Sequence, residues 1–130
     1  MLITGKGHPN VRSEHPTTLA FTRDKAVTPR GDCFVAVDCD WNVGPAFLEK
    51  LRSAKTVTVT IECGGRKDTI VGTGHPELTL SDKDLVIRKS GWVDPRTLMI
   101  GADKAAKDLD KELVQCLKHS GPVKITVHPE

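Results

Sequence analysis

The chain has 130 residues, 38% of them hydrophobic and 28% charged, which is the composition of one soluble globular domain spanning 1–130. Its 19 basic and 17 acidic residues give a formal net charge of +2, too balanced for binding that depends on nucleic-acid electrostatics alone. Three Phe, two Trp and no Tyr argue against a platform that stacks RNA bases. No apolar run is long enough for a membrane span, and residues 1–7 do not resemble a signal peptide, so we expect a cytoplasmic protein without a membrane partner.

Alternation of apolar and polar residues predicts the elements of the first half. Residues 17–22 and 33–39 alternate as strands do, and residues 55–62 form a strong half-buried strand of alternating Thr with Val or Ile. A short helix over 45–53 has a proline in its first turn and carries an apolar stripe. This half reads roughly β-β-β-α-β.

The second half repeats this order of elements. Residues 66–72 follow a Cys63-Gly64-Gly65 turn and should form a hairpin with the preceding strand. Another strand over 84–89 precedes the best helix of the chain, 103–119, which has an apolar face and cationic residues near its end. The last strand covers 122–128.

Matching segments at a nearly constant offset indicate an internal duplication. Gly-x-Gly-His-Pro-x-apolar occupies 5–11 and 72–78, and Val-x-Pro-Arg occupies 27–30 and 93–96. We predict two halves, approximately 1–64 and 65–130, related by a pseudo-twofold axis. Each half alone would leave an apolar sheet face open. We therefore expect a mainly β (α+β) fold in which the halves close into a β-barrel or a two-sheet sandwich with two helices.

The four cysteines do not form a metal-binding motif, because no pair has the Cys-x-x-Cys spacing. Cys33 and Cys39 fall on one face of an expected strand, Cys116 falls on the apolar side of a helix, and Cys63 lies near the hairpin turn. We predict reduced structural thiols and no metal site.

Four of the five histidines precede a proline, namely His8, His15, His75 and His128. Proline holds the preceding residue extended and so fixes the direction of its imidazole. His8 and His15 are close in sequence, and with Asp32 they have the residue types of a metal site or a proton shuttle. The alternative is a histidine that supports its loop through hydrogen bonds, which we expect for His75 and His128.

The segment 28–32, Thr-Pro-Arg-Gly-Asp, is a first candidate anion site. Arg30 could clamp a carboxylate or phosphate, while the adjacent glycine allows a ligand near the backbone. The alternative is an internal turn in which Asp32 caps the chain and pairs with Arg30.

A second candidate anion site contains Arg88, Lys89 and Ser90, followed by Arg96. Cations beside hydroxyl groups are suited to binding an anion, although solvated charges on an outward strand face would look the same. The chain has no Gly-x-x-x-x-Gly-Lys phosphate loop, no nucleophile elbow and no evident glycosidase carboxylate pair. The sequence therefore names no catalytic residue.

Several of these segments together resemble a small archaeal family of uncharacterised proteins, a domain of unknown function. The segments are Gly-His-Pro-Asn-Val at 7–11, Thr-Pro-Arg-Gly-Asp-Cys at 28–33 and Ile-Arg-Lys-Ser at 87–90. The resemblance covers nearly the whole chain. It implies an archaeal source and a mainly β, sandwich-like domain, and it brings no activity and no catalytic residue.

Three functions stay open. The first is a site for a small anionic ligand, such as a nucleotide or phosphorylated metabolite, with or without chemistry. The residues expected to line it are His8, His15, Arg30, Asp32, Arg88, Lys89, Ser90 and Arg96. The second is an RNA or ribonucleoprotein accessory module, and the third is a structural or oligomer-forming protein with buried polar networks. A deep cleft holding His8 and Arg88 would favour the first, and mutual pairing of these groups would favour the third. Cofactor, ligand identity and oligomeric state are left open.

Overall fold

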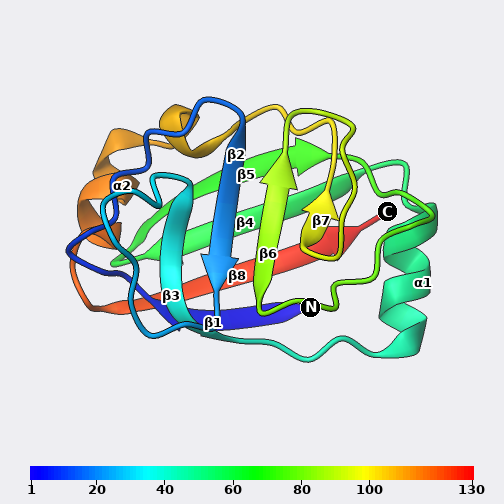
Figure 1. Cartoon of the computed structure of the whole chain (residues 1–130), viewed down its shortest axis with the longest axis horizontal. Coiled ribbons are helices and arrows are strands. Elements are labelled where there is room, and N and C mark those ends of the chain that lie inside the picture. Colours follow the sequence, from blue (N-terminus) through cyan, green and yellow to red (C-terminus); the bar gives the residue numbers. More distant parts are fainter.

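A computed structural model describes the whole chain, residues 1–130 (Figure 1). The first half contains β1 (Leu2–Lys6), β2 (Thr18–Thr22), β3 (Phe34–Asp40), α1 (Pro45–Ser53) and β4 (Val57–Cys63). The second half contains β5 (Arg66–Gly72), β6 (Asp84–Arg88), β7 (Thr97–Met99), the 3-10 helix η1 (Ala106–Asp108), α2 (Lys111–Leu117) and β8 (Pro122–Pro129). The order β-β-β-α-β predicted for each half is confirmed, with η1 as an addition in the second half.

All eight strands belong to one mixed sheet in the order β5-β4-β8-β1-β3-β2-β6-β7. The pairs β2–β3 and β6–β7 are parallel, and the other neighbours are antiparallel. The predicted mainly β (α+β) fold with two helices is therefore confirmed.

The expected closure into a barrel or two separate sheets is wrong. The sheet ends at β5 and β7, whose only link is an isolated bridge between Thr73 and Ile100, just beyond the two strands. Because β7 has three residues and β5 has seven, β7 is too short to form a full ladder along β5. β3 pairs with both β1 and β2, so the sheet is continuous. Figure 1 shows β2, β6 and β7 crossing in front of β4, β5 and β8, and both parts contribute to one core.

A cluster of 30 buried residues forms this core. Alternation along β4 buries Val57, Val59 and Ile61, and the intervening Thr residues stay partly exposed. The two helices lie at opposite ends of the sheet in Figure 1. Leu51 of α1 and Leu113 of α2 are fully buried, and each such side chain contributes about 1.5–3 kcal/mol of hydrophobic stabilisation. Neither helix has the length and apolar character needed to cross a membrane.

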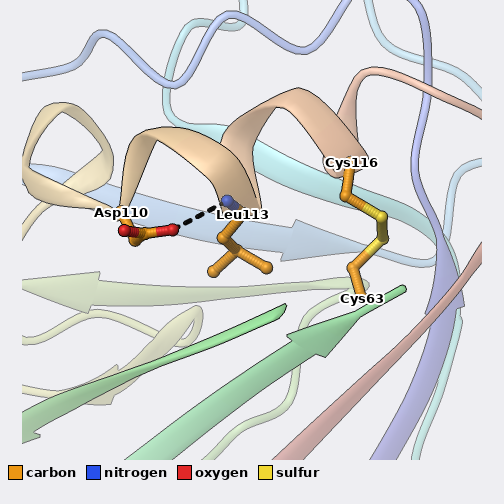
Figure 2. Close-up of a disulfide and its surroundings, with 4 residues drawn as sticks. All are labelled: Cys63, Asp110, Leu113 and Cys116. Atoms are coloured by element: carbon orange, nitrogen blue, oxygen red, sulfur yellow. Dashed lines mark hydrogen bonds between the residues drawn. A yellow bond between two sulfur atoms is a disulfide. The ribbon is translucent and has the colours of Figure 1, made fainter. Parts of the chain in front are cut away.

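The helix predicted over 103–119 is much shorter in the structure. Asp108 accepts a hydrogen bond from the backbone N–H of Ala105 at 2.9 Å, which closes η1, and the backbone is extended at Leu109. Asp110 then caps α2 by accepting from the N–H of Leu113 at 2.9 Å (Figure 2). Aspartate side chains that bind nearby backbone N–H groups favour caps and turns over helix interiors. The apolar periodicity of the segment was therefore a poor guide to where the helix begins.

The prediction of four reduced thiols is also wrong, because Cys63 and Cys116 form a disulfide. The bond joins the end of β4 to α2 (Figure 2), and the two Cα atoms lie 6.0 Å apart, within the usual range for disulfides. A separation of 53 residues gives no local sequence signal for this pairing. Cys39 is buried in the core, as predicted, and Cys33 is partly buried.

Candidate functional site

The outer face of β2 and β6 carries two buried charged residues. Thr22 lies opposite Asp84, and Thr18 lies opposite Arg88, in the antiparallel pairing of these strands. The residues that alternate with them face the core, so Asp84 and Arg88 point to the opposite side of the sheet. Their exposed fractions are nevertheless only 7% and 9%. The β2–β3 and β6–β7 loops therefore cover this face.

Arg88 is satisfied by the loop that follows its strand. Its Nη2 donates to Asp94 Oδ2 at 2.9 Å, and its Nε donates to Thr97 Oγ1 at 3.1 Å. Asp94 also accepts from the backbone N–H of Arg96 at 2.9 Å. Burial raises the pKa of Asp94, but the hydrogen bond from Arg96 and the charge of Arg88 outweigh burial, and the pKa lies below its ordinary value. Arg88 therefore belongs to an internal network.

Lys89 and Ser90 are also engaged within the chain. Lys89 Nζ lies 2.7 Å from Asp108 Oδ2 in a half-buried ion pair. Ser90 Oγ accepts from the backbone N–H of Trp92 at 3.3 Å. Mutual pairing of this kind is what the third hypothesis, a structural role for the polar residues, leads us to expect.

Three of the four histidines that precede a proline accept hydrogen bonds from their own loops, whereas the exposed His128 only lies 3.3 Å from Glu130. Nδ1 of His8 and Nδ1 of His75 each accept from the backbone N–H two residues further on, at 3.0 and 3.1 Å. Nδ1 of His15 accepts from the N–H groups of Thr17 and Thr18 at 3.2 and 3.1 Å. A neutral imidazole that accepts through Nδ1 carries its proton on Nε2. The loop-supporting role expected for His75 therefore applies to His8 and His15 as well.

The eight residues proposed from sequence do not share one cleft. His8 lies at the end of α2, where its N–H donates to a helix carbonyl at 2.9 Å. The carbonyl of Asp32 accepts from the N–H of His15 at 3.3 Å, so these two are neighbours elsewhere. Arg30 is exposed in the β2–β3 loop. Of the eight, Arg96 alone lines a pocket.

That pocket has a volume of about 460 Å³ and lies over the outer face of β2 and β6. The strand pair contributes Thr22 and Asp84, and the β2–β3 loop contributes several small residues and a second carboxylate, Asp24. Phe34 and Val27 provide apolar surface, and Arg96 enters from the loop before β7. The pocket therefore lies between the two loops that the sequence singles out for their Pro-Arg pairs. We call it the β2–β6 pocket.

Asp84 is the unusual residue of the β2–β6 pocket. Its Oδ1 is buried and has no hydrogen-bond partner. The two cations of the pocket do not supply one, since Lys83 is paired with Asp24, and the carboxylate nearest Arg96 is Asp94 at 3.6 Å. A buried polar atom without a partner costs about 1–3 kcal/mol, and more when it is charged. Native proteins retain few such atoms, so each one calls for an explanation, such as a bound water, an ion or a functional role.

Comparison with known proteins shows which family this chain belongs to. Residues 3–130 match the family model described as "Domain of unknown function (DUF371)". The chain belongs to the DUF371 family. An uncharacterized protein of Methanocaldococcus jannaschii is 48% identical over 121 residues, covering 90% of each chain. The archaeal family resemblance drawn from the sequence is thereby confirmed.

The free thiols of this DUF371 chain are not suited to nucleophilic chemistry. Burial raises the pKa of Cys39 to about 12. Burial also raises the pKa of Cys33, and the hydrogen bond with Thr18 only partly offsets this effect. A thiol needs a lowered pKa to be reactive at neutral pH. Neither free thiol of this DUF371 member therefore has the lowered pKa of a cysteine nucleophile.

Sequence reasoning missed Asp84, which lies at the start of the strand Asp-Leu-Val-Ile-Arg. A period of two puts Asp84, Val86 and Arg88 on one strand face. When one face of a strand packs into a core, the opposite face is expected to be exposed to solvent. An aspartate on the exposed face is ordinary and does not indicate a site. Only the covering loops, whose packing is not encoded locally, make the Asp84 carboxylate buried.

Proposed function

We propose that this chain binds a small polar molecule in the β2–β6 pocket. Asp84 accepts hydrogen bonds from a donor or cationic group of the ligand, and Arg96 holds an anionic group. The observation that carries the proposal is the buried Asp84 Oδ1 without a partner, in a residue that lines the pocket. A ligand donor at this atom would remove the cost of burying it.

The size and lining of the β2–β6 pocket support a ligand of metabolite size. Small-molecule sites commonly have volumes of about 300–1,000 Å³ and combine apolar walls with a few polar groups. The β2–β6 pocket, at about 460 Å³, falls in this range. Phe34 and Val27 can cover the apolar part of a ligand, and a nucleotide or phosphorylated metabolite fits the required mixture of donor and anionic groups.

The residues proposed from sequence take different roles in this proposal. Arg96 makes the direct contact with the anion, and the neighbouring exposed Arg30 supplies a second cation from the β2–β3 loop. Arg88 and Lys89 already neutralise Asp94 and Asp108, so they hold the loops rather than the ligand. His8, His15, Asp32 and Ser90 make the local contacts described above and line no pocket.

A structural role is the second candidate function. The internal ion pairs of Arg88 and Lys89 favour it, because both cations are consumed in holding loops against the sheet. The structural role and the binding proposal make different predictions for Asp84. In a purely structural protein the buried carboxylate has no role, and no small molecule should stabilise the fold through it.

A thermal-shift screen tests the binding proposal. Wild-type protein is screened with nucleotides, phosphorylated sugars and amino acids, and each hit is repeated with Asp84→Asn and Arg96→Gln. A ligand of the folded state adds about 2.7 kcal/mol of stability at a hundredfold excess over its Kd. We expect this stabilisation to be largely lost in both variants.

The matched control for this screen is Asp40→Asn, which makes the same chemical change at a carboxylate outside the β2–β6 pocket with 86% of its side chain exposed. The control should respond to ligand like the wild type. Hits that stabilise Asp84→Asn as strongly as the wild type would exclude Asp84 from binding. A screen without hits would favour the structural role.

We further propose that the two halves, 1–64 and 65–130, arose by duplication. The central residues of equivalent strands are partners, with Ala20 opposite Val86 and Thr60 opposite Thr126. The parallel pairs β2–β3 and β6–β7 correspond, as do the antiparallel pairs β1–β8 and β5–β4.

Two equivalent glycines also support a duplication. A Cβ at Gly7 would overlap the carbonyl oxygens at the end of α2, and a Cβ at Gly74 would overlap the Leu51 carbonyl in α1. Both Gly-His-Pro segments therefore pack closely against a helix end. The proposal is tested by comparing the two halves across family members, since diverged copies should share more identities at these equivalent positions than unrelated β-rich segments do.

A further inference from the structure

A groove between residues 12–14 and α2 gathers four cations, three of which have no carboxylate partner. Its lining includes Arg12, Lys107, Lys111 and Lys118, with Glu14 as the one carboxylate. Arg12 pairs with Glu14 at 3.0 Å. The three lysines have no carboxylate within 4.0 Å. The four cations and one carboxylate of this lining give a local net charge that exceeds the formal net charge of +2 of the whole chain. We call this region the α2 groove.

The carboxylates closest in sequence to these lysines are bound elsewhere. Asp108 pairs with Lys89, and Glu112 pairs with Arg66. Asp110 caps the N-terminus of α2 through the N–H of Leu113. The carboxylates of this segment therefore offset the positive charge of the α2 groove only in part, and a concave surface with an excess of one sign of charge attracts counter-ions.

The two walls of the α2 groove are tied together by hydrogen bonds. Ser13 donates from Oγ to the carbonyl of Ala106 at 2.6 Å, and the N–H of Lys107 donates to the carbonyl of His15 at 3.1 Å. Ser13 is buried and has a positive φ of 54°, a conformation that non-glycine residues rarely adopt. Such backbone is held only where the surrounding structure enforces it, and it occurs often at ligand sites.

The helical wall is fixed and presents one face to the α2 groove. Lys111, Val114, Gln115 and Lys118 are spaced i, i+3, i+4 and i+7, so they lie along one side of the helix and its C-cap. The disulfide from Cys116 anchors the same helix to β4 (Figure 2). Lys111 and Lys118 are thus held about 10 Å apart along the axis, from a rise of 1.5 Å per residue.

We propose that the α2 groove binds a linear polyphosphate group, such as that of a nucleoside triphosphate. Lysine ammonium groups bind phosphate as point charges. A spacing of about 10 Å suits charge spread over several linked phosphates better than a single phosphate. The groove has a volume of about 460 Å³, with Leu109 and Val114 as apolar surface, and no aromatic residue lines it for stacking RNA bases. It shares no lining residue with the β2–β6 pocket.

Isothermal titration with inorganic tripolyphosphate tests this site in the full chain at low and moderate salt. The double variant Lys111→Gln with Lys118→Gln should weaken binding at least tenfold. The matched control is Lys50→Gln with Lys55→Gln, which removes the same charge at exposed lysines in and just after α1. The control should change binding less than twofold. Thermal midpoints of both variants show whether they remain folded.

Several outcomes would overturn the proposal. If the wild type does not bind tripolyphosphate, or if the control variant loses as much affinity as the groove variant, the α2 groove is not a specific polyphosphate site. A 12-nucleotide RNA that binds more tightly than tripolyphosphate, with a steep salt dependence from counter-ion release, would assign the groove to nucleic acid instead. Amide chemical shifts provide a second readout, because tripolyphosphate should perturb residues 107–118 and leave the β2–β6 pocket unchanged. Failure of the Asp84 experiments would not affect either result.

Discussion

Arg88 and Asp84 occupy the two ends of the outer face of β6, and only Arg88 has a partner within the chain. The two residues are four positions apart, a separation of about 13 Å along an extended strand, so they cannot neutralise each other. The β6–β7 loop supplies Asp94 and Thr97 to Arg88. The β2–β3 loop supplies no donor to Asp84. The same covered face thus holds a charged residue whose hydrogen bonds are made within the chain, Arg88, and one whose carboxylate has no partner, Asp84. We therefore assign Arg88 to the support of the fold and Asp84 to the proposed binding site.

Removing Arg88 should destabilise the fold. Arg88→Leu leaves Asp94, at 24% side-chain exposure, without its closer cationic partner and with only Arg96 at 3.6 Å. We expect a loss of about 2–3 kcal/mol in the free energy of unfolding, measured from urea transitions. Arg66→Leu is the control, because it breaks an exposed ion pair with Glu112 and should cost less than about 1 kcal/mol. Equal effects of the two variants would contradict the role given to Arg88.

The disulfide between Cys63 and Cys116 should contribute strongly to stability. Cross-linking residues separated by 53 positions removes chain entropy from the unfolded state worth about 4 kcal/mol. The double variant Cys63→Ala with Cys116→Ala should therefore unfold at lower urea concentration by a corresponding amount. Reduction of the wild type with dithiothreitol should approach the same midpoint. Reducing agent should leave the double variant unchanged, and a further shift in that variant would point to another origin for the effect.

Stability should fall in acid because three aspartates, Asp68, Asp94 and Asp108, have lowered pKa values. Burial raises the pKa of Asp68, but hydrogen bonds from Lys104 at 2.6 Å and from the Asp110 N–H at 2.9 Å outweigh it. Asp94 is also shifted down, as described above. A carboxylate with a lowered folded pKa stabilises the fold fully above its unfolded pKa. That contribution is lost as the pH falls below the ordinary value of 3.8 and through the folded value.

Urea transitions at pH 7 and pH 3 measure this dependence. Asp68→Asn should lower stability at pH 7 and reduce the difference between the two pH values. The same change at the exposed Asp40 should leave the difference close to that of the wild type. An undiminished pH dependence in Asp68→Asn would show that other groups control acid unfolding.

Six of the eight strands and the family were predictable from the sequence because their signals are local, whereas β1 and β7 had no predicted range. The alternation of Val and Thr in β4 sets a strand whatever surrounds it, and the expected range differs from the observed one by at most two residues. The start of α2 was missed because Asp108 and Asp110 bind backbone N–H groups before the apolar periodicity takes effect. The spacing of apolar residues does not show which aspartate caps the helix and so where the helix begins.

Closure, the disulfide and the β2–β6 pocket depend on distant contacts. A three-residue β7 prevents a ladder with β5, although the open apolar sheet face expected for each half suggested closure. Cys63 and Cys116 meet only after β4 and α2 have packed together. Asp84 becomes a buried residue only when two loops fold over it. Arg96, which lines the β2–β6 pocket, is one of the cations proposed from the sequence, whereas no sequence pattern distinguishes Asp84.

Replacing Asp84 by valine should stabilise the unliganded protein while removing ligand binding. Valine suits a strand and leaves no unpartnered oxygen, and its neighbour Val86 already tolerates burial on this face with 4% exposure. We expect a gain of about 1 kcal/mol in the free energy of unfolding, a trade-off typical of residues kept for function. The measurement is a urea transition without ligand, alongside Thr22→Val, which changes the facing residue without removing a charge. Thr22 Oγ1 accepts from the N–H of Asp24 at 3.1 Å, so its loss should destabilise. A destabilised Asp84→Val protein would instead show that the carboxylate supports the fold, and the β2–β6 pocket would lose its strongest argument for a ligand.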